Sequence, residues 1–406
     1  MAKLQEKETE IQEKETALQD KTMERVIQDK DRVIASRERQ HPQLNQQLEE
    51  QEQVTAEIQQ TNHSLQRQVE QLQQQLSQQV QTNPDHKPYT IKERKVTLSW
   101  RDGDKAPFNM HRGAAVVDGG VAYFLNWDGR LCSYNKKWSK LPKHPYQHSS
   151  LAVINGHLTV IGGCEDLLKR HTHTNKLLSL RGESWSDVFP PMPTKRRDTT
   201  AATSKEHLIV AGGTTGPYRG NSVNTVEIMD TKTIIWSTVA SLPHPYNFAS
   251  AAICGDHLYM LGGWDDKENE TKSVLTCSLT ELLQSSSSSS VWHIVADAPT
   301  YHSSCAAVKG QLLAVGGCNE YYKETAAIHK YNQRTNTWEH ISDIPTARYF
   351  CLVAVLPTDE MMAVGGHFGG WNTDKVEIAS IYVSVKVGYI KHRHVCTSVL
   401  CNHVLL

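Results

Sequence analysis

The first 81 residues contain no glycine, phenylalanine, tryptophan or tyrosine and only one proline, whereas 21 of them are glutamine. A segment without these side chains cannot build a globular core, although it is rich in helix-forming residues. All 24 glycines and all nine tryptophans of the chain follow residue 99. The composition therefore divides the chain into a helix-prone N-terminal segment and a remainder that contains glycine and tryptophan.

Other absences narrow the range of functions. Lys plus Arg number 43 against 44 for Asp plus Glu, and no basic patch carries interleaved aromatics, so nucleic acid is not an expected partner. No apolar run approaches the roughly 20 residues that span a bilayer, so no membrane association is expected. The charged N-terminus lacks the apolar core of a secretory signal, and the nine cysteines show no paired spacing. We therefore expect a soluble, cytoplasmic protein with reduced cysteines.

A heptad pattern of apolar residues occupies the second half of the N-terminal segment. Its d positions are Leu44, Ile58, Leu65 and Leu72, and its a positions are Leu48, Asn62, Val69 and Leu76. Alternating steps of four and three residues keep one stripe of a helix facing a partner helix. We predict a coiled-coil helix over 1–81, with a break at Pro42, that makes the protein a homo-oligomer. A solvated, partly helical tail is the alternative, and residues 82–95 are predicted to be a polar linker.

Beyond residue 96 the chain repeats a pattern about every 50 residues. Gly-Gly pairs end short apolar strands at Gly162-Gly163, Gly212-Gly213, Gly262-Gly263, Gly316-Gly317 and Gly365-Gly366. Single tryptophans follow the same period at Trp138, Trp185, Trp236, Trp292 and Trp338. One unit is therefore an apolar strand, a strand ending in Gly-Gly, a variable loop, a third strand and a strand that carries tryptophan.

These residue types have physical reasons to recur. A paired glycine permits positive φ and a close approach of neighbouring backbone, and one large aromatic per unit can fill the wedge between twisted sheets. Four antiparallel strands cannot bury both faces alone, so the units must stack. A β-solenoid or a sandwich is the alternative, but Gly-Gly pairs and tryptophans in phase disfavour it. Residues 96–383 thereby resemble the Kelch-repeat family, and the resemblance implies a β-propeller.

The first unit and the chain ends determine the number of blades. Leu125-Asn126-Trp127 stands where the first Gly-Gly is expected, so we interpret this unit as a degenerate blade. The last unit ends at a third strand, Lys375–Val383, and Val96–Trp100 supplies a tryptophan strand at the front. An N-terminal strand that completes the last blade would join the ends of the ring and remove exposed edges. We predict an all-β, six-bladed Kelch propeller over 96–383, followed by a C-terminal tail, 384–406.

Few residues suggest catalysis or metal binding. His171 and His173 alternate in one loop, but two ligands do not make a metal site. The tail contains a denser group with near-metal spacing, namely His392, His394, Cys396, Cys401 and His403. No nucleophile–base pair, paired carboxylate or phosphate-binding loop is evident. We therefore predict no catalytic residue, no metal and no cofactor.

The alternation of strand direction indicates where a ligand would bind. The loop that enters the first strand of a unit and the loop that leaves Gly-Gly should lie on one face, at the mouth of the central channel. Matching the starts of the first strands gives the pairs His111 and Arg112, Gln147 and His148, Arg197 and Asp198, Asn247 and Phe248, Tyr301 and His302, and Arg348 and Tyr349. The family resemblance implies that this rim, with Trp264 and Asp265, holds the ligand. Arg, Tyr, Trp and His are typical interface anchors, although some of these side chains would only fix their own turns.

These features predict a protein-binding scaffold or adaptor that is oligomerised by its coiled coil. Because three arginines and few acids occupy the matched positions, the predicted ligand is an acidic peptide or protein segment. Many Kelch propellers recruit substrates to a cullin ubiquitin ligase through a separate BTB domain, and residues 1–95 lack the length, glycines and aromatics for one. Substrate recognition in a ubiquitin ligase assembly is the alternative. A propeller enzyme, an oxidase or an isomerase, is a second alternative, because the fold alone does not decide function.

Overall fold

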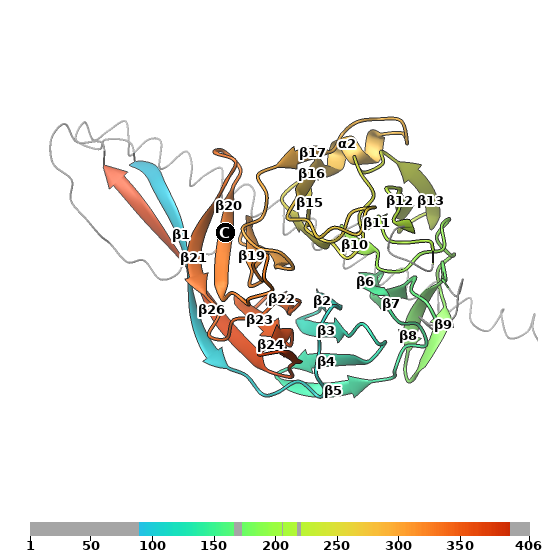
Figure 1. The fold of residues 1–406 in the computed structure, drawn as a ribbon, viewed down its shortest axis with the longest axis horizontal. Helices are drawn as coiled ribbons and strands as arrows, with labels where there is room; N and C mark the ends of the chain where they lie inside the picture. The colour runs from blue at the N-terminus through green and yellow to red at the C-terminus, as the bar shows by residue number, and fades with distance from the viewer. Residues whose placement is uncertain (1–88, 166–172, 205, 217–220, 390–406) are drawn as a thin grey trace, which may run out of the picture. The chain divides into compact units, whose positions relative to one another are not determined.

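The computed structural model describes residues 89–165, 173–204, 206–216 and 221–389. Within them, six four-stranded sheets surround a central axis (Figure 1), as expected for a six-bladed propeller. The propeller lies in a compact unit that includes Ile91–Lys386. The predicted coiled coil over 1–81, the linker up to residue 88 and the tail from residue 390 lie outside the described residues.

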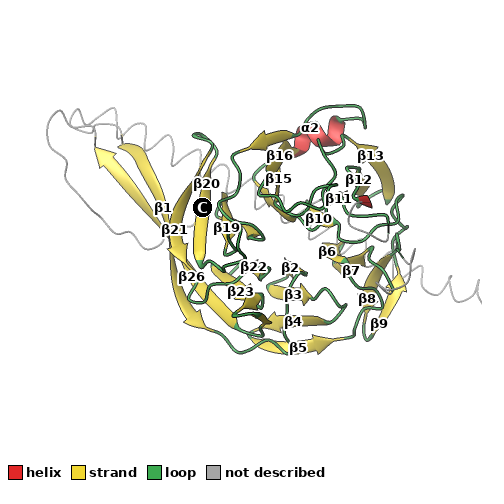
Figure 2. Cartoon of the chain, in the orientation of Figure 1, coloured by secondary structure: helices red, strands yellow, loops and turns green. Residues whose placement is uncertain are grey.

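Each of the first three blades consists of four consecutive antiparallel strands, with the first strand innermost (Figure 2). Blade 1 contains β2 (Ala114–Asp118), β3 (Val121–Leu125), β4 (Leu131–Asn135) and β5 (Lys137–Leu141). Blade 2 contains β6 (Ser150–Ile154), β7 (His157–Ile161), β8 (Leu177–Arg181) and β9 (Ser184–Asp187). Blade 3 contains β10 (Thr200–Thr203), β11 (His207–Ala211), β12 (Val226–Asp230) and β13 (Ile235–Val239). The degenerate first unit therefore forms a complete blade.

The next two blades follow the same order, and a short helix, α2 (Leu279–Gln284), separates the last two strands of blade 4. Blade 4 contains β14 (Ser250–Cys254), β15 (His257–Leu261), β16 (Val274–Ser278) and β17 (His293–Val295). Blade 5 contains β18 (Ser304–Val308), β19 (Gln311–Val315), β20 (Ala327–Asn332) and β21 (Thr337–Asp343).

The sixth blade joins the two ends of the propeller. It contains β22 (Leu352–Leu356), β23 (Glu360–Val364), β26 (Val376–Tyr389) and β1 (Tyr89–Asp102), in the sheet order β1-β26-β23-β22. Figure 1 shows β1, in blue, beside β26, in red. The predicted closure by an N-terminal strand is thus confirmed. Both strands extend beyond the predicted bounds of 96–383, and they are neighbours in the sheet of blade 6.

The hydrophobic core lies between the blades rather than inside any one of them. Each of the six interfaces between neighbouring blades encloses its own cluster of buried apolar side chains. At the closure, Val96 and Leu98 of β1 join Val315 of blade 5 and Met361 of blade 6. Since each sheet contributes only one wall of a cluster, the blades depend on one another for burial.

The repeated tryptophans connect neighbouring blades. Trp338, on the outermost strand of blade 5, donates its indole N–H to the Ala296 carbonyl of the preceding blade at 3.0 Å. Equivalent bonds of 2.8 to 3.2 Å are made by Trp138, Trp185, Trp236 and Trp292. The buried Nε1 of Trp100 in β1 has no hydrogen-bond partner among the described residues. The indole of Trp100 in the closing strand β1 is therefore packed without the hydrogen bond that the other five blade tryptophans make.

The Gly-Gly pairs allow the second strand to pass close to the entry of the next blade. Gly162 and Gly163 have φ values of 61° and 104°. A Cβ on Gly162 would lie 2.5 Å from the Arg196 carbonyl oxygen, and one on Gly163 would lie 2.5 Å from that of Gln147. Any side chain here would collide with backbone, so glycine is required for steric as well as conformational reasons.

Candidate binding surface at the channel mouth

A ring of residues with left-handed backbone precedes the innermost strands. These residues are Arg112 (φ 48°), His148 (φ 54°), Asp198 (φ 54°), Phe248 (φ 57°), His302 (φ 54°) and Phe350 (φ 53°). Their backbones join neighbouring blades, because the amide of Phe248 donates to the Asp198 carbonyl at 3.0 Å and that of Phe350 to the His302 carbonyl at 3.1 Å. We call this circle of residues the inner ring.

In blades 2 to 6 the residue before the inner-ring position pairs with the loop that leaves Gly-Gly. The paired residues are Gln147 and Cys164, Arg197 and Thr214, Asn247 and Trp264, Tyr301 and Cys318, and Tyr349 and His367. The two loops expected on one face therefore meet there in blades 2 to 6. Five of the six pairs taken from the sequence, those that begin at His111, Gln147, Arg197, Asn247 and Tyr301, end on an inner-ring residue.

In blade 6 the predicted pair, Arg348 and Tyr349, lies one residue before the pair that the structure places at the rim, Tyr349 and Phe350. The inner-ring residue is Phe350, and Arg348 is completely buried beneath the rim. The Arg348 guanidinium donates to the Gly365 carbonyl at 2.9 Å and forms an ion pair with Glu377. Arg348 therefore corresponds to Arg196 of blade 3, another fully buried arginine, and not to Arg197. The shared spacing Pro-x-x-Arg in the two blades carried this information in the sequence.

Aromatic rings fill the mouth around Trp264, which is only 2% exposed. Its ring lies 5.1 Å from that of Phe248 and 4.8 Å from that of His302, and it stacks on Phe350 at 5.9 Å. The Arg112 guanidinium lies over the Phe350 ring at 4.4 Å and near the Trp264 ring at 5.5 Å, within cation–π range. Trp264, predicted as a contact residue, thus forms the floor of the mouth.

The rings continue towards blades 1 and 2. Trp127 lies 5.7 Å from His111 and 5.5 Å from His148, and His148 lies 5.6 Å from Phe248. Burial, together with the charge of the adjacent Arg112, lowers the pKa of His111 to about 4. The His111 imidazole is therefore neutral at neutral pH, and the adjacent Arg112 carries the positive charge on this side of the floor.

The second arginine of the predicted rim is also neutralised. Asp198, whose side chain is almost fully buried, accepts from Nη1 of Arg197 and lies 2.6 Å from Nδ1 of His148. Arg197 donates its Nε–H to Nε2 of His173 at 3.1 Å. Since Arg197 and Arg348 each face a carboxylate inside the protein, they offer little charge to an acidic ligand.

Exposed aromatic side chains stand on the loops of blades 5 and 6. Tyr321 and Trp371 are 79% and 80% exposed, and Tyr322 and Phe368 are about half exposed. Phe368 and Trp371 lie opposite each other in a small hairpin formed by β24 (His367–Phe368) and β25 (Trp371–Asn372). The hairpin contacts the blade 5 loop, because the Gly369 amide donates to Oε1 of Glu324 at 3.2 Å. We call these four aromatic residues the aromatic ridge.

The aromatic ridge was not among the predicted binding residues, although the sequence contains one signal for it. The ridge residues lie in the variable loops that follow Gly-Gly, whose lengths differ between repeats, so matching the repeats does not align them. Trp371, however, follows Gly365 too closely to belong to the series of blade tryptophans. A tryptophan outside the structural series needs another reason to be there, and exposed tryptophans often anchor partners.

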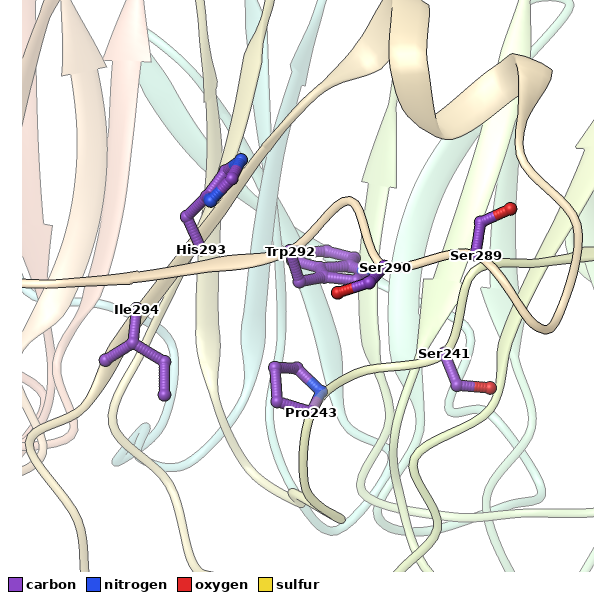
Figure 3. Close-up of a pocket in the computed structure, with 7 residues that line it drawn as sticks. All are labelled: Ser241, Pro243, Ser289, Ser290, Trp292, His293 and Ile294. Carbon is purple, nitrogen blue, oxygen red and sulfur yellow. The ribbon is translucent and has the colours of Figure 1, made fainter.

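An open pocket of about 400 Å³ lies at the outer edge of blades 3 and 4. It is formed by the turn after β13 and the segment that enters β17, and its lining residues are Ser241, Pro243, Ser289, Ser290, Trp292, His293 and Ile294 (Figure 3). Trp292 is mostly buried and donates its indole N–H to the Ala240 carbonyl at 3.0 Å. His293 is the one titratable side chain in this lining.

Comparisons with known proteins find a recognised sequence motif in two of the six blades. The Kelch motif matches residues 195–243 and 299–345, which correspond to blades 3 and 5. The Kelch-like protein terF of Aspergillus terreus (strain NIH 2624 / FGSC A1156) is 26% identical over 279 residues, which cover 62% of this chain and 58% of terF. Beta-scruin of Limulus polyphemus is 24% identical over 255 residues, which cover 58% of this chain and 27% of beta-scruin. The chain thus spans less than two thirds of either relative.

The structure of YjhT matches with a TM-score of 0.56 over 71% of this chain and 97% of YjhT, at 15% identity, and so is similar in fold. Two of the six blades of this propeller therefore carry segments that match the Kelch motif.

The described residues also bear on the expected environment and on metal binding. Six of their cysteines are free thiols, namely Cys132, Cys254, Cys277, Cys305, Cys318 and Cys351. In this part of the chain no helix has the length and apolar character needed to cross a membrane. His173 accepts from Arg197, whereas His171 and the Cys- and His-containing tail lie outside the described residues. Among the residues that are described, no three potential metal ligands gather in one place.

Proposed function

We propose that this protein is a protein-binding scaffold or adaptor whose propeller recognises a protein or peptide partner at the channel mouth, without catalysing a reaction. The aromatic ridge is the observation that carries this proposal. Trp371 and Tyr321 are among the most exposed large aromatic side chains of the described residues, and they lie on adjacent loops of one face. Large aromatics left in water are typical anchors of interfaces.

The floor beneath the ridge is suited to binding because it is already organised. Trp264 is enclosed by rings from three blades, and the inner ring joins neighbouring blades through backbone hydrogen bonds. A preorganised surface loses little conformational entropy when a partner binds. Contacts made by the exposed side chains above this floor would therefore contribute to affinity with little loss of conformational entropy.

We further propose that the N-terminal coiled coil oligomerises the protein. Two or more tethered propellers would bind a multivalent partner with increased avidity, without any new contact. The free thiols of the described residues favour a reducing, cytoplasmic environment for this role. A role in substrate recognition within a ubiquitin ligase assembly is compatible with the same surface if a partner of the coiled coil supplies the link to the ligase.

The proposal is tested by affinity capture with the immobilised full-length chain, followed by quantitative mass spectrometry. The mouth variant carries Arg112→Asn and Trp371→Ala, since asparagine tolerates the left-handed backbone at residue 112. The matched control carries Arg334→Asn and Ile235→Ala, which remove an exposed arginine from the turn between β20 and β21 and an exposed apolar side chain from the outer strand β13. We expect a defined set of proteins to be lost from the mouth variant alone. Equal capture by all three chains would refute binding at this face.

A further inference from the structure

The aromatic ridge stands among carboxylates. The blade 4 loop, Trp264–Lys272, contains four acidic residues and two lysines, and Asp266 is exposed. In the blade 5 loop, the exposed Glu320 is adjacent to Tyr321. The field above this part of the mouth is therefore negative, which is the opposite of what an acidic ligand requires.

Two further carboxylates touch the ridge directly. Tyr322 donates its hydroxyl to Oε1 of Glu270 at 2.6 Å, and this hydrogen bond raises the pKa of Tyr322 to about 12. Glu324 accepts from the Gly369 amide at the tip of the hairpin that carries Phe368 and Trp371. These contacts fix acceptor oxygens beside exposed ring faces. Such a combination suits a cation that can lie on a ring and donate hydrogen bonds at its edge.

Cationic side chains of the protein itself already lie over aromatic rings on this face. The guanidinium of Arg112 lies 4.4 Å from the centre of the Phe350 ring, within the aromatic floor. Lys272 likewise lies over the ring of Tyr301 at 5.2 Å. Rings on this face therefore accept cations from the protein itself, whereas the rings of Tyr321 and Trp371 are directed to solvent.

We propose that the aromatic ridge, with the carboxylates of the blade 4 and blade 5 loops, binds a basic peptide segment of the partner through its arginine or lysine side chains. This inference rests on the proposed function, because it names the chemistry of the partner bound at the same mouth. It also replaces the acidic ligand expected from the sequence. Two of the three arginines behind that expectation are paired with carboxylates inside the protein, while Asp266 and Glu320 remain exposed.

Fluorescence polarisation with the full-length chain tests the inference. The probes are three fluorescein-labelled nine-residue peptides that carry three arginines, three citrullines or three glutamates in one Gly/Ser background. Citrulline keeps the planar shape of arginine without its charge. The variants are Trp371→Ala and Glu320→Gln. Their matched controls are Ile235→Ala, in the outer strand β13, and Glu183→Gln, in the turn between β8 and β9, and both change exposed residues away from the mouth.

We expect the arginine peptide to bind at least about tenfold more tightly than the other two, since it alone combines charge with a planar donor. Trp371→Ala should weaken it by about tenfold, and Glu320→Gln by about threefold at low salt, with the latter effect lost at high salt. Both controls should bind as the wild type does. Preferential binding of the glutamate peptide, or arginine-peptide affinity unchanged in Trp371→Ala, would overturn the inference.

The capture experiment separates this inference from the function on which it rests. If the arginine peptide fails while the mouth variant still loses its captured proteins, the mouth binds partners but the basic ligand class is wrong. If neither the peptide affinity nor the capture responds to mouth substitutions, both proposals fail.

Discussion

The buried arginine of blade 6 offers the sharpest test of how the propeller is held together. Arg348→Ala removes a guanidinium that is completely buried. The guanidinium donates to the Gly365 and Lys375 carbonyls at 2.9 and 3.0 Å and pairs with Glu377, which is also fully buried. Burial opposes ionisation of Glu377, but the hydrogen bond from Thr346 and the charge of Arg348 hold its pKa below the ordinary value.

The substitution therefore leaves a buried charge with fewer partners. Glu377 would retain Lys375 Nζ at 3.0 Å and the Thr346 hydroxyl at 2.6 Å. Three backbone carbonyls, those of Gly365, Lys375 and Thr346, would lose the donor that Arg348 provides. Removing one member of a buried ion pair typically costs about 3–5 kcal/mol. At about 2 °C per kcal/mol for a domain of this size, the melting temperature should fall by roughly 6–10 °C.

Differential scanning calorimetry of the full-length chain measures the effect. Arg112→Asn is the matched control, because it removes a partly exposed arginine of the mouth, and it should lower the melting temperature by less than about 2 °C. The double variant Arg348→Met/Glu377→Gln should recover much of the loss, since no unpaired charge remains. A melting temperature for Arg348→Ala equal to that of Arg112→Asn would refute the reasoning.

Three other predictions concern the buried His144, the indole hydrogen bonds between blades and the predicted coiled coil. Burial lowers the pKa of His144 from 6.5 to about 4, so the unfolded chain takes up the proton first. Stability should be complete above pH 6.5 and decrease by about 3 kcal/mol as the pH falls to 4, and His144→Gln should flatten this decrease in melts at several pH values. Trp338→Phe should cost about 1 kcal/mol in thermal unfolding by removing an indole bond, whereas Trp100→Phe, which loses no such bond, should cost less. Leu65→Glu with Leu72→Glu should convert a dimer or trimer into monomers in light scattering.

Each of these predictions has an outcome that contradicts it. A wild-type melting temperature that is level between pH 6.5 and 4 would contradict the buried neutral histidine. Equal losses for the two tryptophans would show that the indole bond is unimportant. For the heptads, Gln60→Glu with Gln74→Glu places the same charges on the outer helix face. Equal masses for the leucine and glutamine variants would contradict the coiled coil.

The architecture could be predicted from the sequence because the residues that recur in it, above all the Gly-Gly pairs, are there for steric reasons. Gly162 and Gly163 are required where backbones approach within contact distance, and a close backbone approach recurs at the Gly-Gly pairs of blades 3 to 6. The closure could be predicted because a strand that carries Trp100 at one end was needed to complete a blade at the other. The coiled coil remains a prediction, since its residues lie outside the described part of the chain.

The binding surface could be predicted only in part, because its chemistry depends on contacts between blades. The sequence does not show that Asp198 neutralises Arg197. Nor does it show that Glu377 neutralises Arg348, because the two residues are 29 positions apart in the chain. In blade 6, matching the repeats one residue too early placed the buried Arg348 on the predicted rim and left out Phe350, the actual inner-ring residue. The aromatic ridge arises from two loops of different blades, and only the fold brings Glu324 of one to Gly369 of the other.

Site-specific photo-crosslinking tests the central claim that partners bind at the channel mouth. Benzophenone-bearing phenylalanine is placed at Trp371 in one full-length chain and at Ile294, an exposed position of an outer strand, in another. The account predicts covalent adducts with captured proteins from position 371 and none from position 294. Adducts from position 294 alone would contradict it and place the partner on the outer edge of the propeller.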